Sequence, residues 1–145
     1  ANAYLAYESL SCGMKDMLAG LRTVNIYEMK KQRAAAMRVN EIDEQPIQAE
    51  HPLIRIHGET GRKTLYISYH GITRRIAGMS DAESRPLLDY LRGHATRSEF
   101  TCRFRWKAGS MAIWDNRCVQ HLAVNDYHGH RRVMHRITIN GERTS

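Results

Sequence analysis

One histidine and two arginines near the end of the chain have the types and the spacing of a small-molecule site. His121 is followed, eleven and fifteen residues later, by Arg132 and Arg136. If the two arginines share a β-strand, their side chains point to one side and lie roughly 13 Å apart, because alternate strand residues face the same way. Two cations on a buried face would be costly unless an anion met them. The pattern therefore predicts a bound carboxylate, sulfonate or phosphate.

His121 by itself supports two interpretations. It lies in the apolar run Cys118–Val124, which is typical of a strand. A single histidine in such a strand is more often a hydrogen-bonded core residue than a metal ligand, and imidazole serves both roles. The spacing to the two arginines favours the ligand.

Most of the elements that must position these residues are predicted to be strands. Apolar runs and alternation between polar and apolar residues carry this signal, and Gly58–Gly61 has the residues of a hairpin turn. The expected strands are Pro52–His57, Thr64–Ser68, Phe100–Trp106, Met111–Trp114 and the two that carry His121 and Arg132. Many strands with one or two helices predict a jelly-roll or cupin-like barrel with a helical covering.

Two helices are expected. Ser11 is a candidate N-cap ahead of an apolar stripe formed by Met14, Met17, Leu18 and Leu21. Ser80–Glu83 has the pattern of a capping box, and Leu87, Leu88 and Leu91 give the buried stripe behind it. The polar stretch from Lys30 to Glu50 is either a mobile connection or a functional lid, and the sequence leaves both open.

Charge and composition narrow the class of protein. The 145 residues fit one domain, and the net charge is +7, from 22 basic and 15 acidic residues. The basic residues are scattered along the chain, which disfavours a dedicated nucleic-acid site. Most are arginine, the residue suited to bidentate binding of small anions.

The cysteines and the hydropathy pattern indicate a cytoplasmic protein. Cys12, Cys102 and Cys118 are an odd count with no paired spacing, which argues for a reducing compartment and against a disulfide framework or a structural zinc site. No apolar run is long enough to cross a membrane, and the first residues show no secretory pattern.

The last third of the chain resembles a known family. The matching segments are Trp106–Gly109, Ile113–Arg117, Gln120–His121, Asn125–Tyr127 and Arg131–Arg136. They are similar to the C-terminal part of the taurine dioxygenase family of iron(II)- and 2-oxoglutarate-dependent oxygenases. Further matches upstream are His51–Leu53, Glu59–Lys63, Gly78–Ser84 and His94–Arg97, and Glu99–Arg103 resembles members that act on phenoxyalkanoates.

The resemblance implies a fold, two cofactors and three site residues. The fold would be a double-stranded β-helix (a jelly roll, cupin-like) that is incomplete at its N-terminus. His121 matches an Fe(II) ligand, Arg132 the arginine that pairs with a carboxylate of the cosubstrate 2-oxoglutarate, and Arg136 the arginine that meets an anionic substrate. The family reaction uses O2 to hydroxylate a small organic substrate (a sulfonate, a sulfate ester or an aryloxyalkanoate) and converts 2-oxoglutarate to succinate and CO2.

One family motif has no counterpart in this sequence. A facial triad needs two histidines and a carboxylate, and the family supplies the first two ligands as H-x-D. The only H-x-D/E here is His57-Gly58-Glu59, which lies in the predicted hairpin and is expected to be a solvent-facing turn. We therefore expect residues 1–145 to be the C-terminal part of a single oxygenase domain, without a catalytic residue of its own and inactive alone.

Two other functions stay open at this point. A non-catalytic barrel of the same fold could bind a small anion or a protein partner without iron. A basic nucleic-acid module ranks third. An incomplete barrel would also expose edge strands and could form a homo-oligomer.

Several conspicuous residues are assigned ordinary structural roles. Trp106, Trp114 and Cys118 are expected in the core, and Asp115–Asn116 in a turn at a strand end. His128 and His130 flank a glycine, which predicts a surface loop rather than a metal site.

Overall fold

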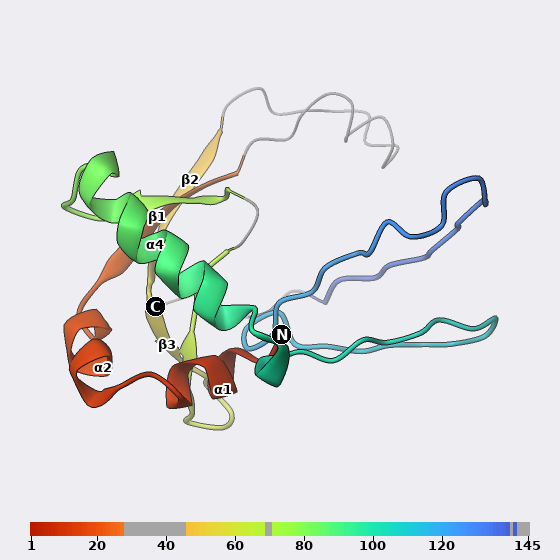
Figure 1. Cartoon of the computed structure of the whole chain (residues 1–145), viewed down its shortest axis with the longest axis horizontal. Coiled ribbons are helices and arrows are strands. Elements are labelled where there is room, and N and C mark those ends of the chain that lie inside the picture. The colour runs from red at the N-terminus through yellow and green to blue at the C-terminus, as the bar shows by residue number, and fades with distance from the viewer. Residues whose placement is uncertain (28–45, 69–70, 140, 142–145) are drawn as a thin grey trace.

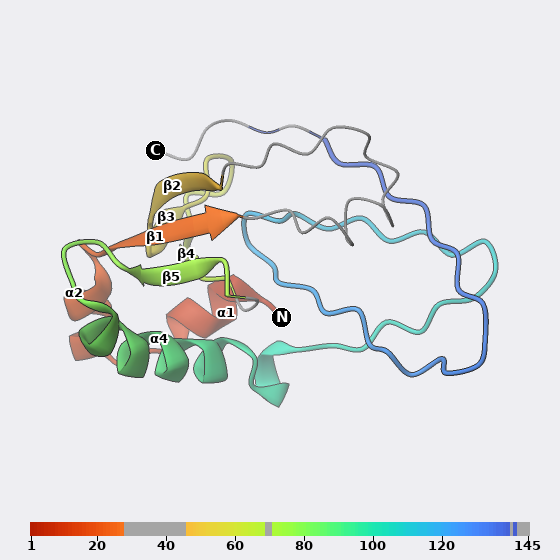
Figure 2. The ribbon, with the colours of Figure 1, turned by 90° about the horizontal axis from the view of Figure 1, so that it is seen from above.

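Two parts of different character make up the molecule (Figure 1). The computed structural model describes residues 1–27, 46–68, 71–139 and 141. Within these ranges, every helix and strand lies in residues 1–100, which pack into one body. Residues 101–139 run mostly as extended chain that leaves this body, as a second view at right angles also shows (Figure 2).

A three-stranded antiparallel sheet forms one layer of the body. Its strands are β1 (Arg22–Tyr27), β2 (Ile47–Pro52) and β5 (Thr73–Ile76), in the order β2-β1-β5. Thr23 is paired with His51 on one side and with Ile76 on the other. The sequence patterns did not reveal β1, and β2 begins inside the polar stretch Lys30–Glu50, of which residues 30–45 lie outside the described residues.

A two-stranded hairpin forms the second sheet and confirms the prediction at this place. β3 (Ile54–Ile56) pairs antiparallel with β4 (Lys63–Leu65). The turn between them is closed by hydrogen bonds from the Gly61 N–H to the His57 carbonyl (2.8 Å) and from the His57 N–H to the Arg62 carbonyl (2.9 Å). Gly61 has φ 66°, a conformation that costs glycine little.

Local sequence signals fix the helices. In α1 (Ala3–Glu8) the Asn2 side chain accepts from two backbone N–H groups, and in α2 (Cys12–Leu18) Ser11 is the N-cap, as predicted. The capping box of Ser80 and Glu83 is also confirmed, at the start of α4 (Asp81–Ala95). The 3-10 turn η1 (Ser98–Phe100) follows α4.

The core lies where the helices meet the two sheets. Ala6 of α1, Leu18 of α2 and Leu91 of α4 are all fully buried. The other members of this cluster are Leu10, Leu53, Leu65, Ile67, Ile76, Leu88 and Ala95. The predicted combination of β-strands with flanking helices is therefore confirmed. No helix among the described residues is long and apolar enough to cross a membrane.

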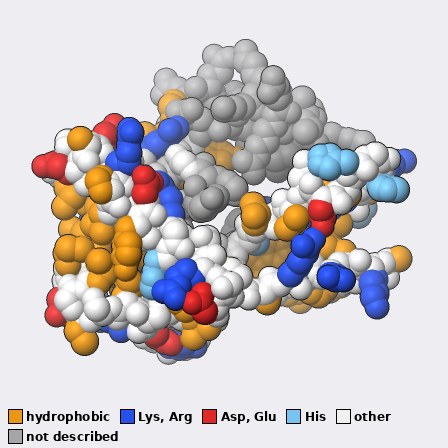
Figure 3. Space-filling model, viewed as in Figure 1, with side chains coloured by type: hydrophobic (Ala, Val, Ile, Leu, Met, Phe, Trp, Pro, Cys, Tyr) orange, Lys and Arg blue, Asp and Glu red, His pale blue; other side chains and the backbone are white. Residues whose placement is uncertain are grey.

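Residues 101–139 form two arms that leave the body. The first arm, residues 101–114, reverses at a turn in which the Ser110 N–H donates to the Lys107 carbonyl (3.0 Å). The second arm, residues 121–139, reverses where the His130 N–H donates to the Tyr127 carbonyl (3.0 Å). Figure 3 shows Lys, Arg and His side chains gathered along these arms at the right of the view.

The strands predicted for this part of the chain are wrong for the structure described. Within the described residues, no strand follows β5; residues 98–100 form η1, and the chain beyond has one isolated bridge, between Asn2 and Val119. A strand needs a neighbouring backbone to pair with, and the described hydrogen bonds inside the arms close turns instead. The apolar side chains consequently face solvent, and Ile113 and Ile137 are 90% and 93% exposed.

Candidate functional site

A tight turn, residues 115–119, connects the two arms at their base. The Asp115 carbonyl accepts from the N–H groups of Cys118 (3.2 Å) and Val119 (3.1 Å), and Asp115 Oδ1 accepts from the Arg117 N–H (2.8 Å). The expected turn at Asp115–Asn116 is therefore confirmed, but it does not end a strand, since none of the described residues after β5 belongs to one. We call residues 115–119 the base turn.

Backbone hydrogen bonds fix the C-terminal end of the base turn, which leads to His121, to the start of the chain. The Ala3 N–H donates to the Cys118 carbonyl (2.9 Å), and the Gln120 N–H donates to the Ala1 carbonyl (2.9 Å). The Gln120 side-chain amide also donates to the Ile67 carbonyl. These bonds fix the residue that directly precedes His121.

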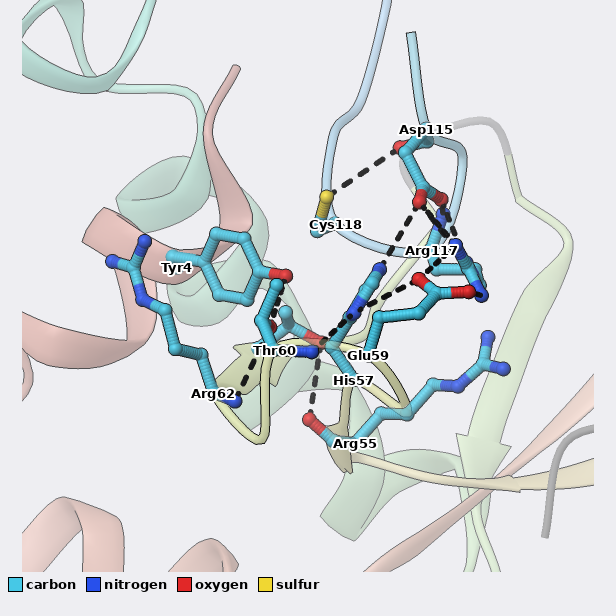
Figure 4. A network of polar contacts seen from close by, with 10 residues as sticks. Tyr4, Arg55, His57, Glu59, Thr60, Arg62, Asp115, Arg117 and Cys118 are labelled. Atoms are coloured by element: carbon cyan, nitrogen blue, oxygen red, sulfur yellow. Dashed lines mark hydrogen bonds and ion pairs between the residues drawn. The ribbon is translucent and has the colours of Figure 1, made fainter.

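A buried histidine of the hairpin, His57, fixes the N-terminal end of the base turn, at Asp115 (Figure 4). His57 is only 4% exposed, which corrects the prediction of a solvent-facing turn. The Thr60 N–H donates to His57 Nδ1 (3.3 Å), so the ring proton is assigned to Nε2, which donates to Asp115 Oδ2 (3.0 Å). A buried imidazole needs both partners, because a polar atom left unpaired there would be destabilising.

Arg117 makes a second connection between the base turn and the hairpin. Its Nη2 donates to Asp115 Oδ2 (2.6 Å) and to Glu59 Oε2 (2.6 Å). The hydrogen bonds from Arg117 hold the pKa of the Asp115 carboxyl well below its usual range, and the bond from His57 acts in the same direction. Arg117 also lowers the pKa of Glu59. We call His57, Glu59, Asp115 and Arg117 the His57 network.

The hairpin turn that carries His57 is held against α1 on its other side. The Tyr4 hydroxyl shares a hydrogen bond with Thr60 Oγ1 (2.9 Å), and the Arg62 guanidinium lies 4.1 Å from the centre of the Tyr4 ring. Arg62 also donates to Glu8 Oε1 (2.6 Å). The turn around His57 is thus a firm support for the base turn.

Two members of the His57 network, together with Cys118, have the composition of a metal site but do not have the charge balance of one. His57, Asp115 and Cys118 each offer a ligand atom, and these atoms lie within 4.8 Å of one another. However, Arg117 donates to both Asp115 oxygens (2.6–3.0 Å) and His57 donates to one of them (3.0 Å). A metal ion would have to displace these donors and sit beside a guanidinium cation, which repels it. The geometry therefore fits a hydrogen-bond network better than a metal centre.

His121 lies two residues after the base turn, at the start of the second arm. Its side chain is exposed, and its ring contacts the indole of Trp114, with centroids 4.9 Å apart and planes inclined by 48°. Trp114 ends the first arm, so the two arms meet through this ring contact. The Trp114 Nε1–H donates to Asn116 Oδ1 (2.9 Å), which ties the indole to the base turn.

The two arginines of the predicted anion site lie further along the second arm, and both are exposed. The Arg132 guanidinium lies 5.1 Å from the centre of the Tyr127 ring. The described residues therefore do not form the buried arginine face considered from the sequence. A small-molecule site that includes His121 and Arg132 stays a prediction.

Three further interpretations can be compared with the structure. Trp106 and Trp114 are not in the core, because they are 41% and 37% exposed, and Cys118 is only half-buried. The contacts between the two arms, such as the ion pair of Arg103 with Asp126, leave these rings partly open to solvent. His128 and His130 lie in an exposed turn around Gly129, as predicted.

No local sequence pattern indicated the His57 network. His57 and Asp115 are 58 residues apart, and so are Glu59 and Arg117. His57, Glu59 and Asp115 were assigned to turns from their immediate neighbours, which say nothing about partners across the fold. The one sequence signal for these contacts is that a histidine and an aspartate, and a glutamate and an arginine, are separated by the same number of residues. That signal is too weak to predict the contacts without a structure.

Comparisons with known proteins agree on one family. The family profile described as "Taurine catabolism dioxygenase TauD, TfdA family" matches residues 1–138. The chain is 45% identical over 95 residues to an alpha-ketoglutarate-dependent sulfate ester dioxygenase of Pseudomonas putida, covering 66% of this chain and 31% of that protein. It is 42% identical over 87 residues to an alpha-ketoglutarate-dependent 2,4-dichlorophenoxyacetate dioxygenase of Cupriavidus pinatubonensis, covering 60% and 30%.

A solved structure supports the same grouping. A taurine dioxygenase from Burkholderia xenovorans superimposes with a TM-score of 0.66 at 41% identity, over 81% of this chain and 36% of that one. The matched part of this chain thus spans about a third of the length of each of these proteins.

Proposed function

Because the chain belongs to the TauD/TfdA family of taurine catabolism dioxygenases, we propose that it is the C-terminal part of an Fe(II)- and 2-oxoglutarate-dependent dioxygenase domain. The reaction would use O2 to hydroxylate a small organic molecule and would convert 2-oxoglutarate to succinate and CO2. The complete domain would have the double-stranded β-helix (jelly-roll) fold. The observation that carries this proposal is the family match over residues 1–138.

The substrate class follows from what the similar proteins share. Their names specify a sulfate ester, a chlorinated aryloxyacetate and taurine, which is a sulfonate. All three are small organic molecules that carry a sulfate, carboxylate or sulfonate group. The exposed arginines of the second arm suit such a substrate, because a guanidinium binds carboxylate, sulfonate and sulfate oxygens through paired N–H groups. We propose a sulfonate, sulfate ester or aryloxyalkanoate as the substrate.

Three side chains are assigned roles in this proposal. His121 would be the iron ligand, because a neutral imidazole is a side chain that suits iron. Arg132 would hold a carboxylate of 2-oxoglutarate, and Arg136 the anionic group of the substrate. The bound iron and 2-oxoglutarate would supply the oxidation chemistry, while this part of the chain would orient the two organic acids.

The remaining iron ligands are not provided by the one H-x-D/E sequence of the chain. His57 of that sequence is buried and bound to Asp115. We therefore expect the 145-residue chain alone to bind Fe(II) weakly and to release no succinate. Isothermal titration with Fe(II) under nitrogen, followed by a succinate assay, checks this expectation; tight stoichiometric binding with succinate release would show that other residues complete the iron site.

The main test uses the natural protein that contains these residues. Succinate release should require Fe(II) and 2-oxoglutarate and should rise when a substrate from one of the three anion classes is added. A panel of taurine, an alkyl sulfate and 2,4-dichlorophenoxyacetate separates these classes. Normal folding without succinate release from any of them would instead favour a non-catalytic barrel that binds an anion or a protein partner.

A pair of variants separates the two arginines. Arg132→Ala should weaken 2-oxoglutarate binding by about 2–5 kcal/mol, because a buried carboxylate would lose its paired cation. Arg136→Ala should weaken binding of the substrate and leave the affinity for 2-oxoglutarate nearly intact. Titrations of both ligands into both variants measure this. An equal loss of 2-oxoglutarate affinity in the two variants would refute the division of roles.

A further inference from the structure

The path from His57 to His121 is short and runs through the base turn. His57 Nε2 donates to Asp115 Oδ2 (3.0 Å). Asp115 directly follows Trp114, and the Trp114 indole contacts the His121 imidazole at a centroid distance of 4.9 Å. Two contacts and one peptide bond therefore connect a buried residue of the hairpin to the proposed iron ligand.

The two sides of the base turn are held in different ways. The side next to His121 is fixed by the backbone bonds that Cys118 and Gln120 make with Ala3 and Ala1. The side next to Trp114 is fixed by the carboxylate of Asp115. The position of Trp114, and with it one face of the His121 ring, thus depends on where Asp115 is held.

His57 is the partner that connects Asp115 to the body. The bonds between Arg117 and Asp115 lie inside the base turn, so they stiffen it without placing it. Glu59 also reaches Arg117 from the hairpin, but its side chain is 67% exposed, and an exposed ion pair of this kind contributes little. The His57 bond is buried at its donor end and supported by the hairpin backbone.

We propose that His57 and Asp115 are positioning residues that hold the Trp114–His121 pair in the orientation needed for metal binding. Neither touches the metal. This inference rests on the proposed function, because it takes His121 as the iron ligand. Hydrogen-bond partners that orient metal-bound histidines typically change metal affinity 10- to 100-fold when removed, and an indirect support should lie near the lower end of that range.

The experiment measures Co(II) binding to the natural protein that contains these residues, from the visible absorption of the bound ion. His57→Leu, which keeps the buried volume and removes both hydrogen bonds, should lower Co(II) affinity about tenfold and change the absorption band. His57→Gln, which can donate to Asp115 and accept from Thr60, should restore affinity to within about twofold of wild type.

His94→Leu is the matched control for a loss of stability. His94 is also a buried histidine, 8% exposed, but its Nε2 bonds the Ala6 carbonyl (2.8 Å) and not the base turn. The variant should lower the melting temperature about as much as His57→Leu and leave Co(II) affinity and spectrum unchanged. Equal losses of affinity in the two variants would overturn the proposal.

Asp115→Ala provides a second route if His57→Leu does not fold, because Asp115 lies at the surface end of the bond. It should reproduce the tenfold loss, whereas Glu59→Ala should change Co(II) affinity less than twofold. The double variant of His57 and Asp115 should be no weaker than either single variant, since both remove the same bond. Additive losses would contradict a shared role.

His121→Ala in the same protein separates the two proposals. If it abolishes Co(II) binding while His57→Leu and Asp115→Ala bind like wild type, only the positioning role fails. If His121→Ala binds Co(II) like wild type, the ligand assignment fails and the positioning role with it. Loss of binding in His121→Ala, together with tenfold losses in His57→Leu and Asp115→Ala, supports both.

Discussion

The body and the arms use the same kinds of side chain with opposite results. In residues 1–100, Leu91 and Ile76 are fully buried, whereas Ile113 and Ile137 in the arms are at least 90% exposed. The body contains helices, whose backbone bonds are internal, and strands that find partners within the described residues. The arms have strand-like sequences, but within the described residues neither arm contains a paired strand. Burial of an apolar side chain therefore depends on the pairing of the backbone that carries it.

The base turn joins these two regions, and its contacts belong to the body. The turn is bonded to Ala3 of α1 and to His57 of the hairpin. Gln120, the residue after the turn, is bonded to Ala1 and to Ile67. The arms begin where these contacts stop. The position of His121, one residue beyond Gln120, is therefore set by the body, while Arg132 and Arg136 lie well beyond that support.

The largest expected difference between the regions is in protease sensitivity. In the 145-residue chain, trypsin should cut after Arg105 in the first arm and after Arg132 in the second at least about a thousandfold faster than after Arg92 within α4. Cutting α4 requires the body to unfold, which costs about 5–15 kcal/mol. Mass spectrometry of a time course checks this. Equal rates at these three bonds would mean that the arms are protected or that the body is not folded.

A core substitution should show the next largest effect. Leu91→Ala should lower the free energy of unfolding by about 2–5 kcal/mol, because it leaves a cavity among fully buried side chains. Ile137→Ala, the same kind of truncation in an arm, should change it by less than about 0.5 kcal/mol. Chemical denaturation followed by circular dichroism measures both. A comparable loss for Ile137→Ala would show that the arm is packed in solution.

A pair of serines compares capping in the two regions. Ser80→Ala removes the N-cap of α4 and should cost about 1 kcal/mol. Ser110 likewise accepts from a backbone N–H, that of Lys107 (3.0 Å), but at the tip of the first arm. Ser110→Ala should leave the free energy of unfolding unchanged, and a measurable loss would indicate that the arm tip is part of the cooperative unit.

The smallest expected effect is in acid, at the base turn. The pKa of Asp115 is lowered in the folded state, first by Arg117 and also by His57. Its contribution to stability is present above the unfolded carboxyl pKa of about 3.9 and is lost as the pH falls toward the lower folded value. The other groups facing Asp115 are Glu59 and Cys118.

Asp115→Asn should therefore flatten the fall in unfolding free energy below about pH 4. Glu99→Gln is the control: the pKa of Glu99 is lowered to about 2 by Arg97, but both side chains are exposed, and such pairs contribute little. Urea titrations at several acidic pH values compare the variants. If Asp115→Asn and Glu99→Gln flatten the pH dependence of the unfolding free energy equally, Asp115 has no special role in acid stability.

The sequence by itself determined the features that depend on neighbours in the chain. The caps at Ser11 and Ser80, the turn at Gly58–Gly61 and the exposed turn at Gly129 were all predictable, because each involves residues within about four positions of one another. The family was also readable from short runs such as those around Trp114 and His121.

Only the tertiary structure decided which of these features meet. The burial of His57 and its bond to Asp115 join residues 58 positions apart, and no local pattern specifies that pairing. The sequence likewise did not decide whether the arms pair as strands. The alternation of polar and apolar residues predicts which face of a strand is apolar, but it does not show whether a partner strand is present. Side-chain periodicity is a property of one segment, whereas pairing and burial are properties of two, and this is why the first could be read from the sequence and the second could not.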